Sequence, residues 1–358
     1  MHKEQITDKE AFCLLSLFII GTSLILGVGG QAKNDAWIVG ILGTILAIPI
    51  ILVYARISYL YPGKDLFQII RAIFGNFMGR ALSILYIWYA FHLGALVIRN
   101  FGEFVNIVSL PETPMMVGML SLGLVGVYAV RSGVEILGRI SAYIFPMLLV
   151  VIVLAHLLTI PQWNIDYLKP VLGNGMQPVL SGVFQALAFP FAETILFVSV
   201  FQALKTKKSP YKVFLGGLLF TGVVIAVSTF RNIVMLGSYL DKLYFPSYVA
   251  VSRVSIGDFV QRVEVAVVII FVFGAFLKYS VCLLTLCQGI ADIFSLRNYR
   301  SIVLQAGLLM VYFAYTVYDN AMEMEYWAFK VYPYYAFPFQ IIIPCIIWLL
   351  AEVKVRRR

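Results

Sequence analysis

A single acidic residue, Glu193, lies in the middle of an apolar run at 179–204. That run is long enough to cross a bilayer, which takes roughly 20 residues. Pro190 comes three residues earlier, and because proline lacks an N–H and crowds the preceding turn, we expect the helix to break near 186–190. An ionisable group at membrane depth is costly and marks a ligand or ion pathway. The break and the acid together indicate a midplane binding site of the kind found in secondary transporters.

The composition is that of a membrane protein. Hydrophobic residues make up 61% of the chain, charged residues make up 13%, and the mean hydropathy is +0.91, far from the average soluble domain. Apolar runs of spanning length recur along the chain, so we predict an all-α integral membrane protein whose single transmembrane domain covers 1–358. The first run lacks a small-residue cleavage site and is expected to stay as a helix. Ten spans are predicted, at about 11–30, 36–60, 81–106, 114–131, 139–160, 179–204, 210–237, 258–290, 301–318 and 335–352.

The distribution of positive charge predicts the topology and argues against nucleic-acid binding. With the N-terminus inside, 18 of the 27 Lys and Arg residues fall on the cytoplasmic side, six on the opposite side and three within spans. This bias follows the positive-inside rule and places both termini in the cytoplasm. We interpret the basic tail at 354–358 as a topology anchor that faces anionic lipid, rather than as a nucleic-acid patch.

The first span also contains residues that weaken a helix. Gly21, Thr22 and Ser23 lie near mid-membrane, and further glycines follow at 27–30. Glycine lets the backbone unwind and approach a ligand closely, although small residues also serve for close packing against a neighbouring helix. We favour a break, because spans one and six hold the same place in two halves of five helices. An odd number of helices per half gives the halves opposite orientations, as an inverted repeat requires.

Several segments, in their order and spacing, carry a resemblance to a known family. These segments are Gly21-Thr-Ser23, Asn34-Asp-Ala-Trp-Ile38, Tyr61-Pro-Gly-Lys-Asp-Leu-Phe67, Arg99-Asn-Phe-Gly-Glu103, Glu112-Thr-Pro114, Lys169-Pro-Val-Leu-Gly-Asn-Gly175, Phe189-Pro-Phe-Ala-Glu193 and Arg262-Val-Glu264. Along nearly its whole length the chain resembles the B-subunit family of endospore germinant receptors, which is related to the amino acid–polyamine–organocation transporters. Family members often have glycine where this chain has Ser23 and Ala192. These two side chains would narrow a pocket, so the ligand need not be that of relatives with both glycines.

The resemblance implies a fold, a ligand and partners. The fold would be of the leucine-transporter type, a 5+5 inverted repeat of ten transmembrane helices with discontinuous helices one and six, and with helices three and eight completing a small-molecule site. The ligand would be a nutrient germinant, usually an amino acid and sometimes a nucleoside or a sugar. The partners would be a larger A-type receptor subunit and a C-type lipoprotein subunit in the inner membrane of the spore.

We expect the ligand to lie between the two unwound segments. Free N–H groups at the first break would favour a carboxylate, and free carbonyls at the second would favour an ammonium group. Two tyrosines of the third span would add hydroxyls, although an aromatic residue in a span more often packs than binds. The predicted ligand-binding residues are Gly21, Thr22, Ser23, Tyr86, Tyr89, Phe189, Pro190, Phe191, Ala192 and Glu193.

Two roles are open for Glu193. In a functional role, it senses the amino group of the ligand or couples binding to a movement of span six. In a structural role, it is a carboxyl group that accepts hydrogen bonds from the freed backbone. We favour the functional role, because a buried acid in a span is expensive to keep.

Other charges within or beside the spans are assigned structural or coupling roles. They are Arg99, Glu103, Arg231, Arg262, Glu264 and Lys278. Arg99 and Glu103 are four residues apart and can pair on one helix face. Arg231 is a candidate partner of Glu264, which lies on a different helix face from Arg262. Lys278 either replaces a coupling cation or extends to the cytoplasmic edge of the membrane.

The sequence contains no catalytic constellation, no phosphate-binding glycine loop and no metal-ligand spacing, and its four cysteines show no disulfide pattern. We therefore expect a protein that is not an enzyme and needs no cofactor or metal. The main alternative to a receptor is a secondary active transporter of amino acids or related small organic solutes. A transporter must complete alternating access, whereas a receptor needs only a ligand-dependent shift that reaches a partner.

Overall fold

The computed structural model describes residues 4–254 and 263–356, where all regular structure is helical apart from one isolated bridge between Ile6 and Leu204. The α-helices are α1 (Asp8–Leu26), α2 (Ala36–Leu60), α3 (Leu66–Phe104), α4 (Met115–Ser132), α5 (Val134–Thr159), α6 (Gln177–Ala186), α7 (Phe197–Val200), α8 (Ser209–Leu236), α9 (Pro246–Ser252), α10 (Glu264–Ile293), α11 (Val303–Thr316), α12 (Ala321–Tyr326), α13 (Tyr332–Phe337) and α14 (Ile343–Arg356). Short 3₁₀ or π segments join them: η1 (Gly30–Asp35), η2 (Val105–Ser109), η3 (Ile160–Gln162), η4 (Ile165–Leu168), η5 (Leu187–Phe191), η6 (Ala192–Leu196), η7 (Phe201–Ala203), η8 (Gly237–Lys242), η9 (Tyr299–Ser301), η10 (Trp327–Val331) and η11 (Pro338–Ile342).

The membrane-spanning stretches follow the predicted order. In the part of the chain that the structure describes, nine helical stretches are long and apolar enough to cross a membrane. The shorter apolar helix α11 occupies the remaining predicted position, at 301–318. The last stretch begins at Ala321 rather than at 335, because α12, η10 and α13 continue into η11 and α14.

The third stretch begins at Leu66, well before the predicted start at 81. Asp65 starts this helix by accepting a hydrogen bond from the backbone N–H of Gln68 (2.8 Å), as an N-cap residue does. Gly75 then kinks the helix with a φ of +78°, a conformation that glycine adopts without steric cost. The hydropathy pattern predicted only the part of α3 that follows this kink, which is why the predicted start at 81 is too late.

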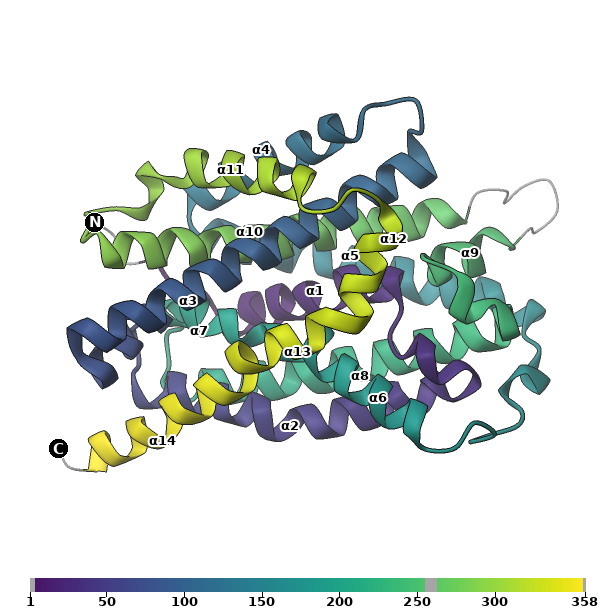
Figure 1. Ribbon diagram of the computed structural model, residues 1–358, viewed down its shortest axis with the longest axis horizontal. Helices are drawn as coiled ribbons and strands as arrows, with labels where there is room; N and C mark the ends of the chain where they lie inside the picture. Colours follow the sequence, from purple (N-terminus) through teal and green to yellow (C-terminus); the bar gives the residue numbers. More distant parts are fainter. Residues whose placement is uncertain (1–3, 255–262, 357–358) are drawn as a thin grey trace.

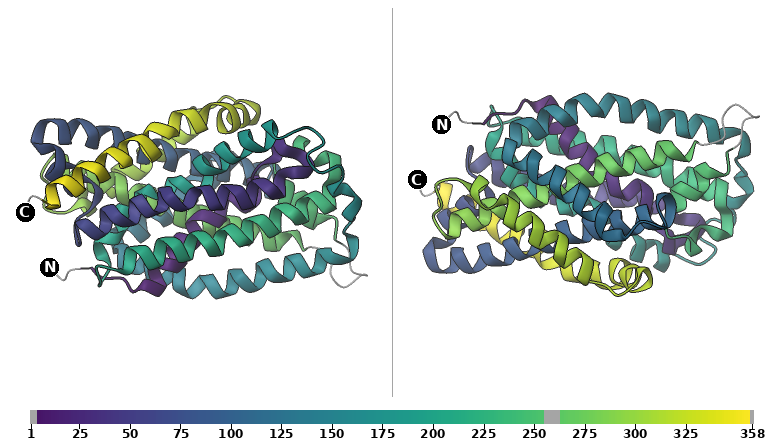
Figure 2. Two further views of the ribbon diagram at one scale, coloured as in Figure 1. Left: turned by 90° about the horizontal axis from the view of Figure 1, so that it is seen from below. Right: turned by 90° about the horizontal axis from the view of Figure 1, so that it is seen from above.

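The helices lie side by side in an elongated bundle (Figure 1). Both chain ends lie at the same end of the bundle (Figure 2), and α9 lies toward the other end (Figure 1). The most buried spanning stretches are α1, α10 and Gln177–Ala203, whereas α5 is largely exposed. The two spans with predicted breaks, one and six, are therefore inner elements.

The position predicted for the first break is wrong. The helix α1 continues through Gly21, Thr22 and Ser23 to Leu26. Gly21 packs directly against Gly274 of α10, where a Cβ atom on Gly21 would lie 2.2 Å from the Cα of Gly274. Close helix packing, and not unwinding, therefore explains this glycine.

The first span ends at Leu26, and two glycines follow it. Gly27 and Gly29 have φ values of +75° and +74°, in the left-handed region where a side chain would be strained. The chain leaves α1 there and enters η1 before α2 begins.

The break predicted in span six is confirmed. The helix α6 ends at Ala186, and Phe189 in η5 has an extended conformation, with φ −135° and ψ 117°. Pro190 follows it, and its ring and missing N–H prevent a regular helix across this point. The span continues as η6, α7 and η7. The sixth span is thus discontinuous, whereas α1 is one continuous helix from Asp8 to Leu26.

Gly274→Ala is expected to lower the stability of the protein. Its methyl group would lie 2.1 Å from the Cα of Gly21, so α1 and α10 would have to move apart, and such overpacking costs about 1–3 kcal/mol. The midpoint of thermal unfolding in detergent should fall. Gly216→Ala is the matched control, because its methyl group would lie 3.7 Å from the ring of Phe12, an ordinary contact. Equal midpoints for wild type and Gly274→Ala would contradict the packing described here.

Candidate functional site

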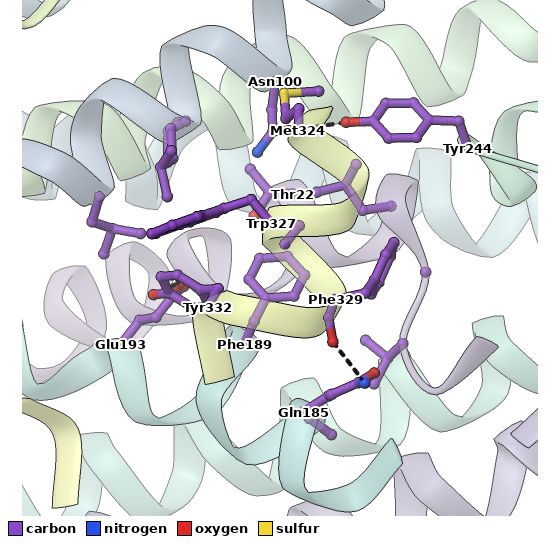
Figure 3. A pocket seen from close by; sticks show the side chains of 18 of the residues that line it. Thr22, Asn100, Gln185, Phe189, Glu193, Tyr244, Met324, Trp327, Phe329 and Tyr332 are labelled. Atoms are coloured by element: carbon purple, nitrogen blue, oxygen red, sulfur yellow. Dashed lines mark hydrogen bonds between the residues drawn. The ribbon is translucent and has the colours of Figure 1, made fainter. Parts of the chain in front are cut away.

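A cavity lies between the end of α1 and the break in span six (Figure 3). Its walls come from the end of α1 and the glycines that follow it, from α3, from η5 and η6, from α10, and from the segment between α12 and α13. Within this cavity, Glu193 and Tyr332 lie toward one side and Asn100 and Tyr244 toward another, with Trp327 between them (Figure 3). The cavity thus has a charged side and a neutral side.

The charged side is a cluster of four residues, which we call the buried network: Thr22, Glu193, Lys278 and Tyr332. The ammonium group of Lys278 forms an ion pair with the carboxylate of Glu193 and donates a hydrogen bond to the Thr22 hydroxyl (3.1 Å). Tyr332 donates its hydroxyl to the other carboxylate oxygen of Glu193 (2.6 Å). Both charged residues are only 1% exposed. The network therefore joins α1, η6, α10 and α13 at one buried point.

The two charges of the network depend on each other. Removing one partner of a buried ion pair leaves the other charge uncompensated and typically costs about 3–5 kcal/mol. The rings of Phe18 and Phe189 also lie 5.0 Å and 4.7 Å from the Lys278 ammonium, in the range of cation–π attraction. The charges of Glu193 and Lys278 are thus neutralised within the protein.

Side chains of the protein also approach the carbonyl groups that the break in span six sets free. Gln340 donates its amide N–H to the carbonyl of Ala188 (2.9 Å). Thr194 donates its hydroxyl to the carbonyl of Phe191 (2.6 Å), and the Tyr54 hydroxyl lies 3.1 Å from the carbonyl of Ala192. Because buried backbone groups need partners, these bonds stabilise the broken conformation.

The other polar lining residues are neutral, and Figure 3 shows them at two ends of the cavity, with Asn100 and Tyr244 at one end and Gln185 at the other. Gln185 of α6 donates to the carbonyl of Phe329 (3.0 Å), and Tyr244 donates to the Oδ1 atom of Asn100 (3.3 Å). The indole nitrogen of Trp327 and the hydroxyl of Tyr318 are buried without a hydrogen-bond partner among the described residues. Polar atoms in this state are costly unless something else bonds to them.

The structure brings some of the predicted ligand-binding residues to the cavity. Thr22, Phe189 and Glu193 line it. The lining does not include Gly21, Ser23, Pro190, Phe191 and Ala192. Ser23 instead donates its hydroxyl to the carbonyl of Ile19 in its own helix (2.7 Å).

The two predicted tyrosines lie behind the cavity wall. Tyr86 donates its hydroxyl to the carbonyl of Phe339 (2.8 Å). The hydroxyl of Tyr89 lies 3.3 Å from that of Tyr332 and accepts a hydrogen bond from Gln340 (2.8 Å). Tyr89 is therefore one hydrogen bond away from the buried network.

The other predicted charges have different surroundings. The pair between Arg99 and Glu103 is present at 2.9 Å, and Arg99 also donates to the carbonyl of Tyr315 (2.9 Å). The predicted ion pair between Arg231 and Glu264 is not formed. The guanidinium group of Arg231 instead donates a hydrogen bond to the side-chain oxygen of its neighbour Asn232 (2.8 Å).

Two further charge predictions remain. Of the two alternatives for Lys278, extension to the cytoplasmic edge is wrong, because its ammonium group is buried in the network. Arg262 lies outside the described residues. Among the residues that are described, no cluster of three His, Cys, Asp or Glu side chains could hold a metal ion.

Sequence reasoning missed Tyr332 of the buried network and most of the neutral residues that line the cavity. Trp327 and Tyr332 lie in a stretch that was expected to be a loop before the last span. The charged residues Glu323 and Glu325 lower the hydropathy of this stretch, so the hydropathy pattern did not predict that it is helical. Gln185 could have been predicted as a cavity residue, because it is a polar residue in an apolar span.

Comparisons with known sequences identify the family. A family model described as "Spore germination protein" matches residues 5–323. Spore germination protein KB of Bacillus subtilis (strain 168) is 30% identical over 100% of this chain and 97% of its own length. Spore germination protein B2 of the same organism is 24% identical over 98% of this chain and 96% of its own length. These matches confirm the resemblance found in the sequence.

Comparisons with solved structures identify the fold. MhsT in complex with L-phenylalanine superposes with a TM-score of 0.68 at 11% identity, covering 99% of this chain and 100% of that chain. Mhp1, a nucleobase-cation-symport-1 family transporter in a closed conformation with bromovinylhydantoin bound, gives a TM-score of 0.61 at 11% identity, covering 99% and 91%. The leucine-transporter type of fold is thereby confirmed. This chain is an integral membrane protein that belongs to the spore germination protein family.

Proposed function

We propose that this chain is the nutrient-sensing membrane subunit of a spore germinant receptor. It binds a small-molecule germinant, such as an amino acid, near the midplane of the membrane and signals to partner subunits. The observation that carries the proposal is one cavity bounded by the end of α1, by the break in span six and by the buried network. Because the network joins four elements, an occupant that displaces one of them changes the contacts of the other three.

The broken sixth span provides a route from the cavity to the end of the bundle with both termini. Glu193 lies in η6, and the same span ends at Ala203, whose carbonyl accepts a hydrogen bond from the backbone N–H of Ile6 (3.0 Å). Near Ile6, Glu4 binds the backbone N–H of Val134 (3.0 Å) and the guanidinium group of Arg300. A ligand that favours one position of this span would shift the equilibrium between two states of the N-terminal segment.

We place this chain in the inner membrane of the spore, with both termini in the cytoplasm and with an A-type subunit and a C-type lipoprotein subunit as partners. The charge distribution supports this topology. Arg71, Arg139, Arg297 and Arg300 are all assigned to the cytoplasmic side by the positive-inside rule, and they line one cavity beside the N-terminal segment. Lys330, assigned to the opposite side, lines a different cavity.

A secondary active transporter of amino acids or related small organic solutes is the alternative, and the fold favours it specifically. Mhp1, which shares this fold, is a transporter of the nucleobase-cation-symport-1 family. A transporter would carry its ligand across the membrane, whereas a receptor would only change its contacts with partners. Uptake of a labelled ligand into vesicles separates the two functions.

Deletion of the gene is expected to abolish germination in response to one class of nutrient. The measurement is dipicolinate release from spores exposed to amino acids, nucleosides and sugars. The strain should lack other receptors of this family, so that they do not mask the loss. The gene for the wild-type chain should restore the response. Unchanged germination after deletion, together with lost solute uptake in growing cells, would contradict the receptor and support the transporter.

Glu193→Gln is expected to abolish the response, because it leaves the Lys278 ammonium buried without a carboxylate and costs about 3–5 kcal/mol. The variant that combines it with Lys278→Met lacks both charges. It should regain the normal amount of protein in the spore membrane, but respond only at a higher germinant concentration. Immunoblots and dose–response curves measure the two effects. Wild-type sensitivity of the double variant would show that the pair only stabilises the fold.

A further inference from the structure

We propose that the buried guanidinium group of Arg231 and the hydroxyl group of Ser247 bind a small inorganic anion, such as chloride. The site is a pocket where α1, α5, α8, α9 and α10 meet. This pocket shares no lining residue with the cavity beside the break in span six, and the inference does not rest on the proposed function. The helix α9 that contributes to it lies away from the end of the bundle with both termini (Figure 1).

The first observation is a buried positive charge with no carboxylate beside it. Arg231 is only 3% exposed, and arginine keeps its proton in proteins. Its Nε and Nη2 atoms both donate to one neutral acceptor, the Oδ1 atom of Asn232 (3.3 Å and 2.8 Å), and its Nη1 atom has no partner among the described residues. No described acidic residue lines the pocket. A buried charge in this state is costly, because nothing neutralises it.

The other buried cations in the described part of the chain show what Arg231 lacks. Lys278 forms an ion pair with Glu193, and Arg99 forms one with Glu103 (2.9 Å). Those two charges are neutralised within the protein, whereas that of Arg231 is not. An anion bound from solution would supply the missing negative charge.

The second observation is the size and lining of the pocket. Its volume is about 20 Å³, which is room for one particle of about the size of a water molecule and too little for an organic molecule. Its polar lining residues are Arg231, His156, Ser228 and Ser247, and the other six are aliphatic residues of α1, α5 and α10. Aliphatic walls exclude bulk water, so the attraction between the guanidinium group and an anion is screened little.

The third observation is that the free polar groups of the pocket are donors. His156 Nδ1 lies 2.7 Å from a carbonyl of its own helix and donates to it, so Nε2 of the neutral ring accepts from the Ser228 hydroxyl (3.1 Å). Ser247 accepts from the Asn232 amide (3.0 Å), and its own donor contact with Asn232 is long at 3.4 Å. Nη1 of Arg231 and the Ser247 hydroxyl are therefore available to an occupant.

This set of groups distinguishes an anion from a water molecule. A buried water molecule needs acceptors for its hydrogens as well as donors, whereas an anion needs donors alone. Hydrogen bonds from a guanidinium group to an anion are also stronger than those between neutral groups. Because Arg231 belongs to α8 and Ser247 to α9, a bound anion would link span seven to the short helix that follows it.

The test measures thermal unfolding of the full-length chain in detergent, in sodium chloride, sodium bromide or sodium gluconate at one ionic strength. Gluconate is too large for the pocket. A ligand that binds only the folded state raises the unfolding midpoint, so the midpoint should be higher in either halide than in gluconate. Radiolabelled chloride retained by the same protein gives the Kd and should reach one ion per chain. Equal midpoints in the three salts, or no retained chloride, would overturn the inference.

Three variants test the assigned residues. Arg231→Met should abolish chloride retention, and its midpoint in gluconate should at least equal that of the wild type, because the unpaired charge is gone. Ser247→Ala removes one hydrogen bond to a charged group and should raise the Kd about ten- to hundredfold. Ser228→Ala is the matched control, because the Ser228 hydroxyl donates to His156, and its Kd should stay at the wild-type value. Wild-type affinity in Arg231→Met, or the same Kd in both serine variants, would refute the assigned site.

Discussion

The ion pair between Glu193 and Lys278 determines much of the arrangement around it. Two charges in the interior of a membrane protein are tolerable only while each neutralises the other, so η6 and α10 must stay in contact. Thr22 and Tyr332 add hydrogen bonds from α1 and α13. Elements from distant parts of the chain therefore meet at one point, and the remaining space beside that point is the cavity. The same pairing that makes the charges tolerable also withdraws them from a ligand.

Several features could be predicted from the sequence because their causes are local. Pro190 breaks span six wherever that span lies, since the ring and the missing N–H act on the preceding turn. Arg99 and Glu103 pair because four residues of helix place them on one face. The order of the spans follows from apolar length alone. In each case the structure-determining interaction lies within one segment of the chain, so no knowledge of its neighbours was needed.

The features that the sequence did not reveal depend on contacts between segments. Gly21 has the same local signature whether it unwinds a helix or packs against another one, and only its contact with Gly274 decides between them. Lys278 has a long side chain that could extend in either direction until Glu193 is placed beside it. The cavity residue Trp327 lies in a helical stretch whose charged residues resemble those of a loop. In all three cases the local sequence allows more than one arrangement, and the surrounding structure decides between them.

The contact between Gly21 and Gly274 divides the bundle into a stiff part and a compliant part. At this crossing point the backbones of α1 and α10 are in contact, so no side chain lies there that could change rotamer and absorb a displacement. The two helices should therefore move as one rigid body. Compliance is left to η5, where the extended conformation of Phe189 already interrupts the helix. Any large motion in this protein is then a hinge at η5 against a fixed pair of helices, rather than sliding between α1 and α10.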